Sequence, residues 1–392
     1  MVSTLGLAAV LLIVGIYIKK FIPVLKKFFI PAPIVGGIVF SVLTLIGHKA
    51  NLFNFTYDDV LKNLFMTAFF TSVGFLASFR LLLQGGIAVV LFLVLAIALL
   101  VIQNIIGVSF SGLFGLDPLQ GLAIGSISLS GGHGTSAAFA PLLEDLGIKS
   151  AMSVSIAAAT FGLVAGSLIG GPVGRMLLMR HKLKPDANEA DNTAITEGKL
   201  TQEEKTVSTR ILFAACCCLI ISMSLGDCLI SILKNRGIIL PPYLGPMVIA
   251  AVIRNIADLT NRSVPVHAID MAGGIALQFF LAMALMTMKL WQLEELAIPL
   301  ITVLLVQMLV TAAFAYFVTF RIMGRNYDAA VIACGHCGFA MGATPNAMAN
   351  IQTFTLANGP SPKAFFVIPM VGSLFIDFFN AFIITSFIKF FS

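Results

Sequence analysis

The residues of this chain that are best suited to chemistry lie in two glycine-rich polar segments. The first, residues 125–135, reads GSISLSGGHGT, and the second, residues 335–345, reads GHCGFAMGATP. Both are surrounded by strongly apolar sequence. Bare N–H groups at helix starts attract carboxylates, whereas hydroxyl and carbonyl oxygens suit a hard cation such as Na⁺. The two segments therefore indicate a site for a small anion and a cation.

Asp377 is a further candidate because it lies near the middle of the last apolar run, one helical turn before Asn380. A carboxylate inside a membrane is energetically expensive and is by default a functional residue. It could hold a cation or meet a substrate ammonium. A structural ion pair is the alternative, but no basic residue lies in the core of the same run.

Three other motifs fit enzymes or metal sites less well. Cys334 and Cys337 have the spacing of a dithiol redox pair but lack the expected βαβ surroundings. His133, His336 and Cys337 lack the fixed short spacings of a zinc site. Ser130 and His133 lack the strand-turn-helix elbow of a serine hydrolase, and no nucleotide fingerprint is present. A membrane-embedded thiol or serine enzyme is therefore only the alternative from another functional class.

The elements that must position these residues are membrane helices. The chain has 392 residues, of which 58% are hydrophobic and 11% charged, with a mean hydropathy of +1.00. These values exclude an ordinary soluble domain. Since about 20 apolar residues cross the hydrocarbon as a helix, we expect ten spans: 3–18, 28–47, 61–79, 86–110, 151–180, 210–233, 238–257, 267–289, 295–320 and 363–390.

The two glycine-rich segments are 210 residues apart, and other features repeat at the same offset. Pro31 falls on Pro241, and Gly132 falls on Gly342. Each half then has five spans and a glycine-rich break between its fourth and fifth spans, which we expect to form a re-entrant hairpin. Five is an odd number, so the second half must enter from the opposite face. The predicted fold is an all-α membrane protein made of two inverted repeats.

Charge predicts the domain division and the orientation. The hydrophilic stretch 181–209 is expected to be a cytoplasmic connector between the repeats 1–180 and 210–392. With both termini outside, 17 of the 24 Lys and Arg residues fall on the cytoplasmic side. The net charge of +6 then reflects membrane topology and is not a nucleic-acid signal.

Residues within the spans suggest packing roles. Four glycines recur at every fourth position of the fifth span and predict close helix contact: Gly162, Gly166, Gly170 and Gly174. Three polar residues of the fourth and ninth spans are expected to bond between helices: Gln103, Asn104 and Gln307. Three charged residues near span ends are expected to reach water: Asp227, Arg254 and Asp270.

The motifs resemble those of the bacterial glutamate:sodium symporter family. The resemblance is carried, in order, by residues 128–135 (SLSGGHGT), 280–286 (FLAMALM) with 289–291 (KLW), 326–330 (NYDAA), 335–345, and 369–372 (PMVG) with 376–377 (ID). It implies Na⁺-driven uptake of L-glutamate across the bacterial inner membrane, with Na⁺ as coupling ion and no other cofactor. It further implies a homodimer in which a transport domain holding both hairpins moves against a scaffold.

Within that resemblance, we expect glutamate to lie between the two hairpin tips. The expected substrate residues are Ser130, Gly131, Gly132, Thr135, Gly342, Ala343, Thr344, Asn346 and Asp377. The expected sodium residues are Ser128, Asp377 and Asn380. The residues alone support a cation-coupled secondary transporter for a small anion, so a carrier of a di- or tricarboxylate is the nearest alternative.

Overall fold

The computed structural model describes residues 2–28, 30–49, 59–185, 208–235, 241–287 and 296–391. Those residues form helices and connecting turns, without strands. The all-helical prediction is therefore confirmed for the described part of the chain. Most of the predicted connector 181–209 lies outside it; α9 ends at His181 and the next described helix, α11, begins at Thr209.

A helix lies in each of the ten predicted apolar ranges. Six helices are long and apolar enough to cross a membrane, and a seventh span is possible if one bent pair counts as a single span. The bent pair is α18 (Pro362–Leu374) and α19 (Ile376–Phe391), whose axes meet at 48°. Asp377 therefore lies in the first turn of a new helix, just after a break that the apolar pattern alone did not reveal.

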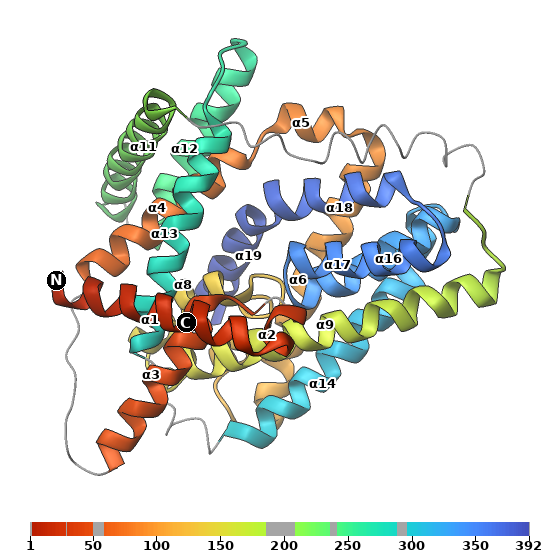
Figure 1. The fold of residues 1–392 in the computed structure, drawn as a ribbon, viewed down its shortest axis with the longest axis horizontal. Coiled ribbons are helices and arrows are strands. Elements are labelled where there is room, and N and C mark those ends of the chain that lie inside the picture. The colour runs from red at the N-terminus through yellow and green to blue at the C-terminus, as the bar shows by residue number, and fades with distance from the viewer. Residues whose placement is uncertain are drawn as a thin grey trace.

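The helices separate into two groups (Figure 1). The first group is α1 (Val2–Phe21), α3 (Ala32–Lys49), α4 (Val60–Leu76), α11 (Thr209–Asn235), α12 (Leu244–Leu259) and α13 (Val266–Met286). The second group is α6 (Gly86–Leu113), α7 (Pro118–Ala123), α8 (Gly132–Asp145), α9 (Ala151–His181), α14 (Ala297–Phe314), α16 (Tyr327–Met341), α17 (Thr344–Asn358), α18 and α19. Two short helices, α2 (Pro23–Lys27) and α5 (Phe79–Gln84), lie in connections.

The prolines that correspond at the offset of 210 lie just before helices. Pro31 directly precedes α3, and Pro241 with Pro242 precedes α12. In both places the first-turn N–H groups have no intrahelical partner to lose, so proline costs little there. Within the first group, α4 packs on both α12 and α13. Gly273 lets α13 approach Ser72 of α4 so closely that a methyl group would overlap the serine hydroxyl.

The glycine stripe of α9 packs against α16, as predicted. A methyl group at Gly162 would overlap the carbonyl oxygen of Met341, and one at Gly166 would lie 3.1 Å from the carbonyl oxygen of Cys337. A methyl group at Gly170 would lie 2.6 Å from the carbonyl oxygen of Cys334, whereas one at Gly174 would lie 2.7 Å from the Phe354 ring and 3.1 Å from Cys334 Cβ. The absence of side chains thus lets two helix backbones meet directly, which is the close contact that small-xxx-small patterns produce.

The second glycine-rich segment is mostly helix, which corrects the expectation that residues 335–345 form a break. α16 continues to Met341, and the break is limited to Gly342 and Ala343. Gly335 packs against Ile351 and Ile368, leaving no space for a side chain. The close packing explains why glycine is present in a helix that its propensity alone disfavours by about 1 kcal/mol per residue.

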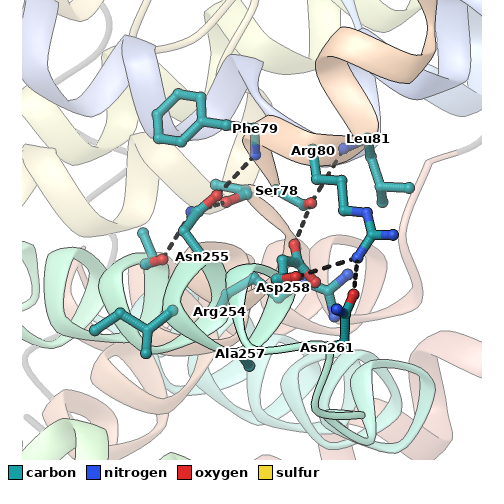
Figure 2. A network of polar contacts seen from close by, with 12 residues as sticks. Ser78, Phe79, Arg80, Leu81, Arg254, Asn255, Ala257, Asp258 and Asn261 are labelled. Atoms are coloured by element: carbon teal, nitrogen blue, oxygen red, sulfur yellow. Dashed lines mark hydrogen bonds and ion pairs between the residues drawn. The ribbon is translucent and has the colours of Figure 1, made fainter.

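A polar network ties the connection between α4 and α5 to the end of α12 (Figure 2). Arg254 Nε and the Ser78 hydroxyl both contact Asp258 Oδ2, the former at 3.2 Å. Arg80 donates to the carbonyl of Asp258 at 3.1 Å and to Asn261 Oδ1 at 2.8 Å. The side chain of Arg254, which we expected to reach water, is 14% exposed and is also paired with Asp258, four residues further along the same helix.

Candidate functional site

A cavity of about 590 Å³ lies where the two helix groups meet, and we call it the central cavity. One wall comes from the second group, at the starts of α8, α17 and α19. The other wall comes from α4, with Phe69 and Ser72, and from α13, with Asp270 and Leu277. Asp270 was expected only to reach water at a span end, so its place in the cavity wall was not predicted.

The predicted substrate residues all line the central cavity. From residues 130–135, which we call the first tip, these are Ser130, Gly131, Gly132 and Thr135. From residues 340–346, which we call the second tip, they are Gly342, Ala343, Thr344 and Asn346. Asp377, at the start of α19, also lines the cavity. Side chains separated by up to 247 positions thus share one cavity, because three helix starts converge on it.

The helix starts present polar backbone groups to the cavity. No side chain caps α8 at Gly131 or α17 at Ala343. The first N–H groups of a helix have no intrahelical partner, so those of Gly132, His133 and Gly134 stay available for a ligand. α17 offers fewer, since Pro345 has no N–H and the N–H of Asn346 bonds back to Ala343. The stronger concentration of free donors is at the first tip, which suits a carboxylate.

Gln103 joins the two tips. Its amide oxygen accepts from the Ser130 hydroxyl at 2.8 Å, and its amide nitrogen donates to the carbonyl of Ala340 at 2.8 Å. Ser130 also contacts that carbonyl, at 3.0 Å. Gln307 of α14 donates to the backbone carbonyl of Gln103 at 2.7 Å. The predicted interhelical role of these glutamines is confirmed, and it fixes one tip to the other.

The predicted sodium residues lie behind the first tip, except for Asp377. Ser128 is fully buried and its hydroxyl donates to the carbonyl of Ala123. Asn380 is 1% exposed; its amide nitrogen donates to the carbonyl of Ser126 at 3.1 Å. Its amide oxygen has no hydrogen-bond partner among the described residues. A buried acceptor without a donor is what a cation ligand requires.

His133 lines the central cavity but was considered only as a metal ligand or a catalytic base. Its Nε2 lies 3.0 Å from the Thr160 hydroxyl, which itself donates to the carbonyl of Ile156 at 2.9 Å. Because that hydroxyl has given its one hydrogen away, it accepts from His133 Nε2–H. The ring of a neutral His133 therefore keeps Nδ1 as an acceptor. The place of His133 in the sequence, directly after Gly131 and Gly132, is the signal that could have suggested a polar group lining the cavity.

Charge in the central cavity is unevenly distributed. Its lining includes two carboxylates, Asp270 and Asp377, but no Lys or Arg among the described residues. Cys334 and Cys337 lie elsewhere, fully buried within α16, where Cys334 faces the α9 stripe. An anion entering the cavity must therefore be stabilised by helix N–H groups, by hydroxyls and by cations that enter with it.

Comparison with known proteins identifies the family. The family model described as the sodium/glutamate symporter matches residues 1–360. The sodium/glutamate symporter of Haemophilus influenzae is 42% identical over 383 residues, covering 97% of this chain and 95% of that protein. The sodium/glutamate symporter of Escherichia coli is 40% identical over 384 residues, covering 97% and 96%. This chain therefore belongs to the sodium/glutamate symporter family.

Proposed function

We propose that the protein imports L-glutamate together with Na⁺ across the bacterial inner membrane. The observation that carries this proposal is the central cavity, where uncapped helix starts and two carboxylates meet and the described lining contains no lysine or arginine. Family membership adds the substrate, since the relatives at 40–42% identity are named for sodium and glutamate. As members of a symporter family they are transporters, and no enzymatic step is needed here.

The charge of the cavity supplies a reason for coupling. Glutamate carries two carboxylates and one ammonium, so it would bring a net charge of −1 to a cavity that already has Asp270 and Asp377. Helix N-termini stabilise an anion by only about 0.3–1 kcal/mol each in exposed settings. Na⁺ bound beside the substrate offsets the remaining repulsion. Binding of the two is then mutually favourable, as a symporter requires.

The residues of the central cavity have distinct proposed roles. The N–H groups at Gly132 and Gly134 receive one carboxylate, and Thr344 at the second tip receives the other. Asp377 meets the ammonium. Na⁺ binds behind the first tip to Ser128 and to Asn380, whose amide oxygen has no hydrogen-bond partner among the described residues. Asp377, one helical turn earlier on α19, shares the ion.

Helix order and packing support two inverted repeats. Adding 210 to the bounds of α3 and α9 gives 242–259 and 361–391, against Leu244–Leu259 for α12 and 362–391 for α18 with α19. Contacts recur as well: α3 packs on α13 as α12 packs on α4, and α8 packs on α9 as α17 packs on α18. An odd number of spans per repeat inverts the second copy. The helix pairs α7–α8 and α16–α17 would then be hairpins entering from opposite faces.

The two helix groups suit an alternating-access mechanism. We assign the first group as scaffold and the second as transport domain, because both tips belong to the second group while α4 and α13 form the opposite wall. Both termini are proposed to be periplasmic, following the excess of basic residues on the other side. α1 and α11 are largely exposed, since only 17% of the apolar stretch of each helix is buried. These two scaffold helices offer a surface through which a homodimer would form.

The experiment is uptake into liposomes that contain the purified protein and an imposed inward Na⁺ gradient. We expect labelled glutamate to accumulate against its own gradient, and a Na⁺ ionophore to abolish the accumulation. A panel of competing amino acids, citrate and malate identifies the substrate class. Transport of citrate or malate without glutamate would refute the proposed substrate, and uptake that only equilibrates would refute coupling.

A further inference from the structure

A second cavity, of about 900 Å³, lies between α9 and α17, on the side where α9 ends. Its inner end is lined by Ser167 and Asn350, and its outer end by Arg175 and Asn358. Phe28, from the connection between α2 and α3, closes it on the scaffold side. The walls between are mostly apolar. We call it the lateral cavity.

The lateral cavity adjoins the central cavity along α9 and α17. On α9, Leu163 lines the central cavity and Ser167 the lateral one, a single helical turn apart. On α17 the same holds for Asn346 and Asn350. The Asn346 amide nitrogen donates to the Ser167 hydroxyl at 3.1 Å and to the carbonyl of Leu163 at 2.7 Å. The Asn350 amide nitrogen donates to the carbonyl of Gly166 at 2.9 Å. Hydrogen bonds between α9 and α17 thus separate the two neighbouring cavities.

The two cavities have opposite charge. The central cavity is lined by two carboxylates and no Lys or Arg, whereas the lateral cavity is lined by Arg175 and no Asp or Glu within the described residues. Arg175 is exposed, and the described part of the chain supplies it with no carboxylate partner. A guanidinium presents several N–H donors in a fork that matches a carboxylate. The lateral cavity therefore favours an anion.

We propose that the lateral cavity is a second carboxylate-binding site, which holds an anionic amino acid after it leaves the central cavity. This inference rests on the proposed function. Arg175 binds a substrate carboxylate at this second site, while the hydrogen bonds between α9 and α17 stay in place. The polar inner end, at Ser167 and Asn350, suits an amino acid better than an acyl chain, so glutamate is the occupant that the geometry favours over a lipid.

The test compares the two faces of the transporter in right-side-out and inside-out vesicles from the same cells. In Arg175→Gln, the glutamate concentration that half-saturates Na⁺-driven uptake should rise about two- to fivefold in inside-out vesicles, because the lost ion pair involves an exposed side chain and is weakened by water. It should stay unchanged in right-side-out vesicles. Arg175→Lys should retain most of the affinity. Arg180→Gln, on the same helix but outside the lining, should match the wild type in both.

Three results would overturn the proposal. The first is an unchanged half-saturating glutamate concentration in inside-out vesicles, and the second is an equal change in both orientations. The third is a difference between variant and wild type that disappears when both purified proteins are reconstituted into purely zwitterionic lipid. The last result would make Arg175 a contact for anionic lipid headgroups. Failure of the proposed function is distinguishable, because the wild type would then take up no glutamate with a Na⁺ gradient in either orientation.

Discussion

Gly162 offers a direct test of how the second tip is positioned. Replacing it by Ala would place a methyl group on the carbonyl oxygen of Met341, the residue directly before the break at Gly342. The same methyl would lie 3.1 Å from Leu129, close to the first tip. Backbone cannot rotate away as a side chain can. The end of α16 must therefore withdraw by about 1 Å to restore a normal contact distance.

The effect of that shift on substrate binding follows from hydrogen-bond geometry. A bond of about 2.9 Å that lengthens by about 1 Å is no longer a hydrogen bond. Loss of one bond to a charged group costs about 1.5–3 kcal/mol. The half-saturating glutamate concentration should therefore rise about 10- to 100-fold. Stability should change less, because overpacking of about 1–3 kcal/mol is partly offset by the gain of up to about 1 kcal/mol from replacing a helical glycine.

A series of glycine-to-alanine variants with increasing overlap measures how displacement of α16 affects glutamate binding. Gly112→Ala in α6 introduces no contact within 4 Å and should transport like the wild type. Gly166→Ala, whose methyl would lie 3.1 Å from the Cys337 carbonyl, should raise half-saturation only about two- to fivefold, since a shift of a few tenths of an ångström suffices. The assay is initial Na⁺-driven glutamate uptake, normalised to protein in the membrane. Equal behaviour of Gly162→Ala and Gly112→Ala would refute the reasoning.

Three further substitutions test the site and its supports. Asp377→Asn should abolish Na⁺-dependent glutamate uptake while the protein stays in the membrane; retained uptake would remove Asp377 from the site. Gln103→Leu breaks two hydrogen bonds that hold the tips, including that to Ser130, and should lower the unfolding free energy by about 1–3 kcal/mol, measured by thermal unfolding in detergent. Asp258→Ala leaves Arg254, whose side chain is 14% exposed, without its ion-pair partner, and should lower the unfolding free energy by about 1–2 kcal/mol. If the effects of Asp258→Ala and Arg254→Ala simply add in a double-mutant cycle, the two side chains do not stabilise each other.

Much of this site could be predicted from sequence because its signals are local. The helices α8 and α17 start without side-chain caps at Gly131 and Ala343, and the small residues at both starts can be recognised in the sequence. The spacing of four residues from Gly162 to Gly174 likewise fixes one helix face. For the same reason Gln103 could be predicted to bond between helices, since an amide inside a long apolar helix needs a partner.

The remainder depends on contacts between distant segments. Gly335 looked like part of a break because its propensity disfavours helix, but packing against Ile351 and Ile368 overrides a preference of about 1 kcal/mol. The bend before Asp377 has no glycine or proline at the break itself, so the pattern indicated one straight span. Asp270 reaches the central cavity only because α13 crosses α4, and no local signal predicts which helices cross.

The contact between Ser130 and Ala340 bears on how such a site could change its access. These residues are 210 positions apart, the offset at which the two halves of the sequence correspond. Equivalent points of the proposed repeats thus touch each other, and Gln103 bonds to both. A substrate bound to either tip would be carried by both, because moving one alone would break buried hydrogen bonds worth about 1 kcal/mol each. The wall formed by α4 and α13 has no such bond to the tips among the described contacts. The displacement of the second helix group past the first, as proposed above, would therefore leave these bonds intact and would expose an unbroken site to each side in turn.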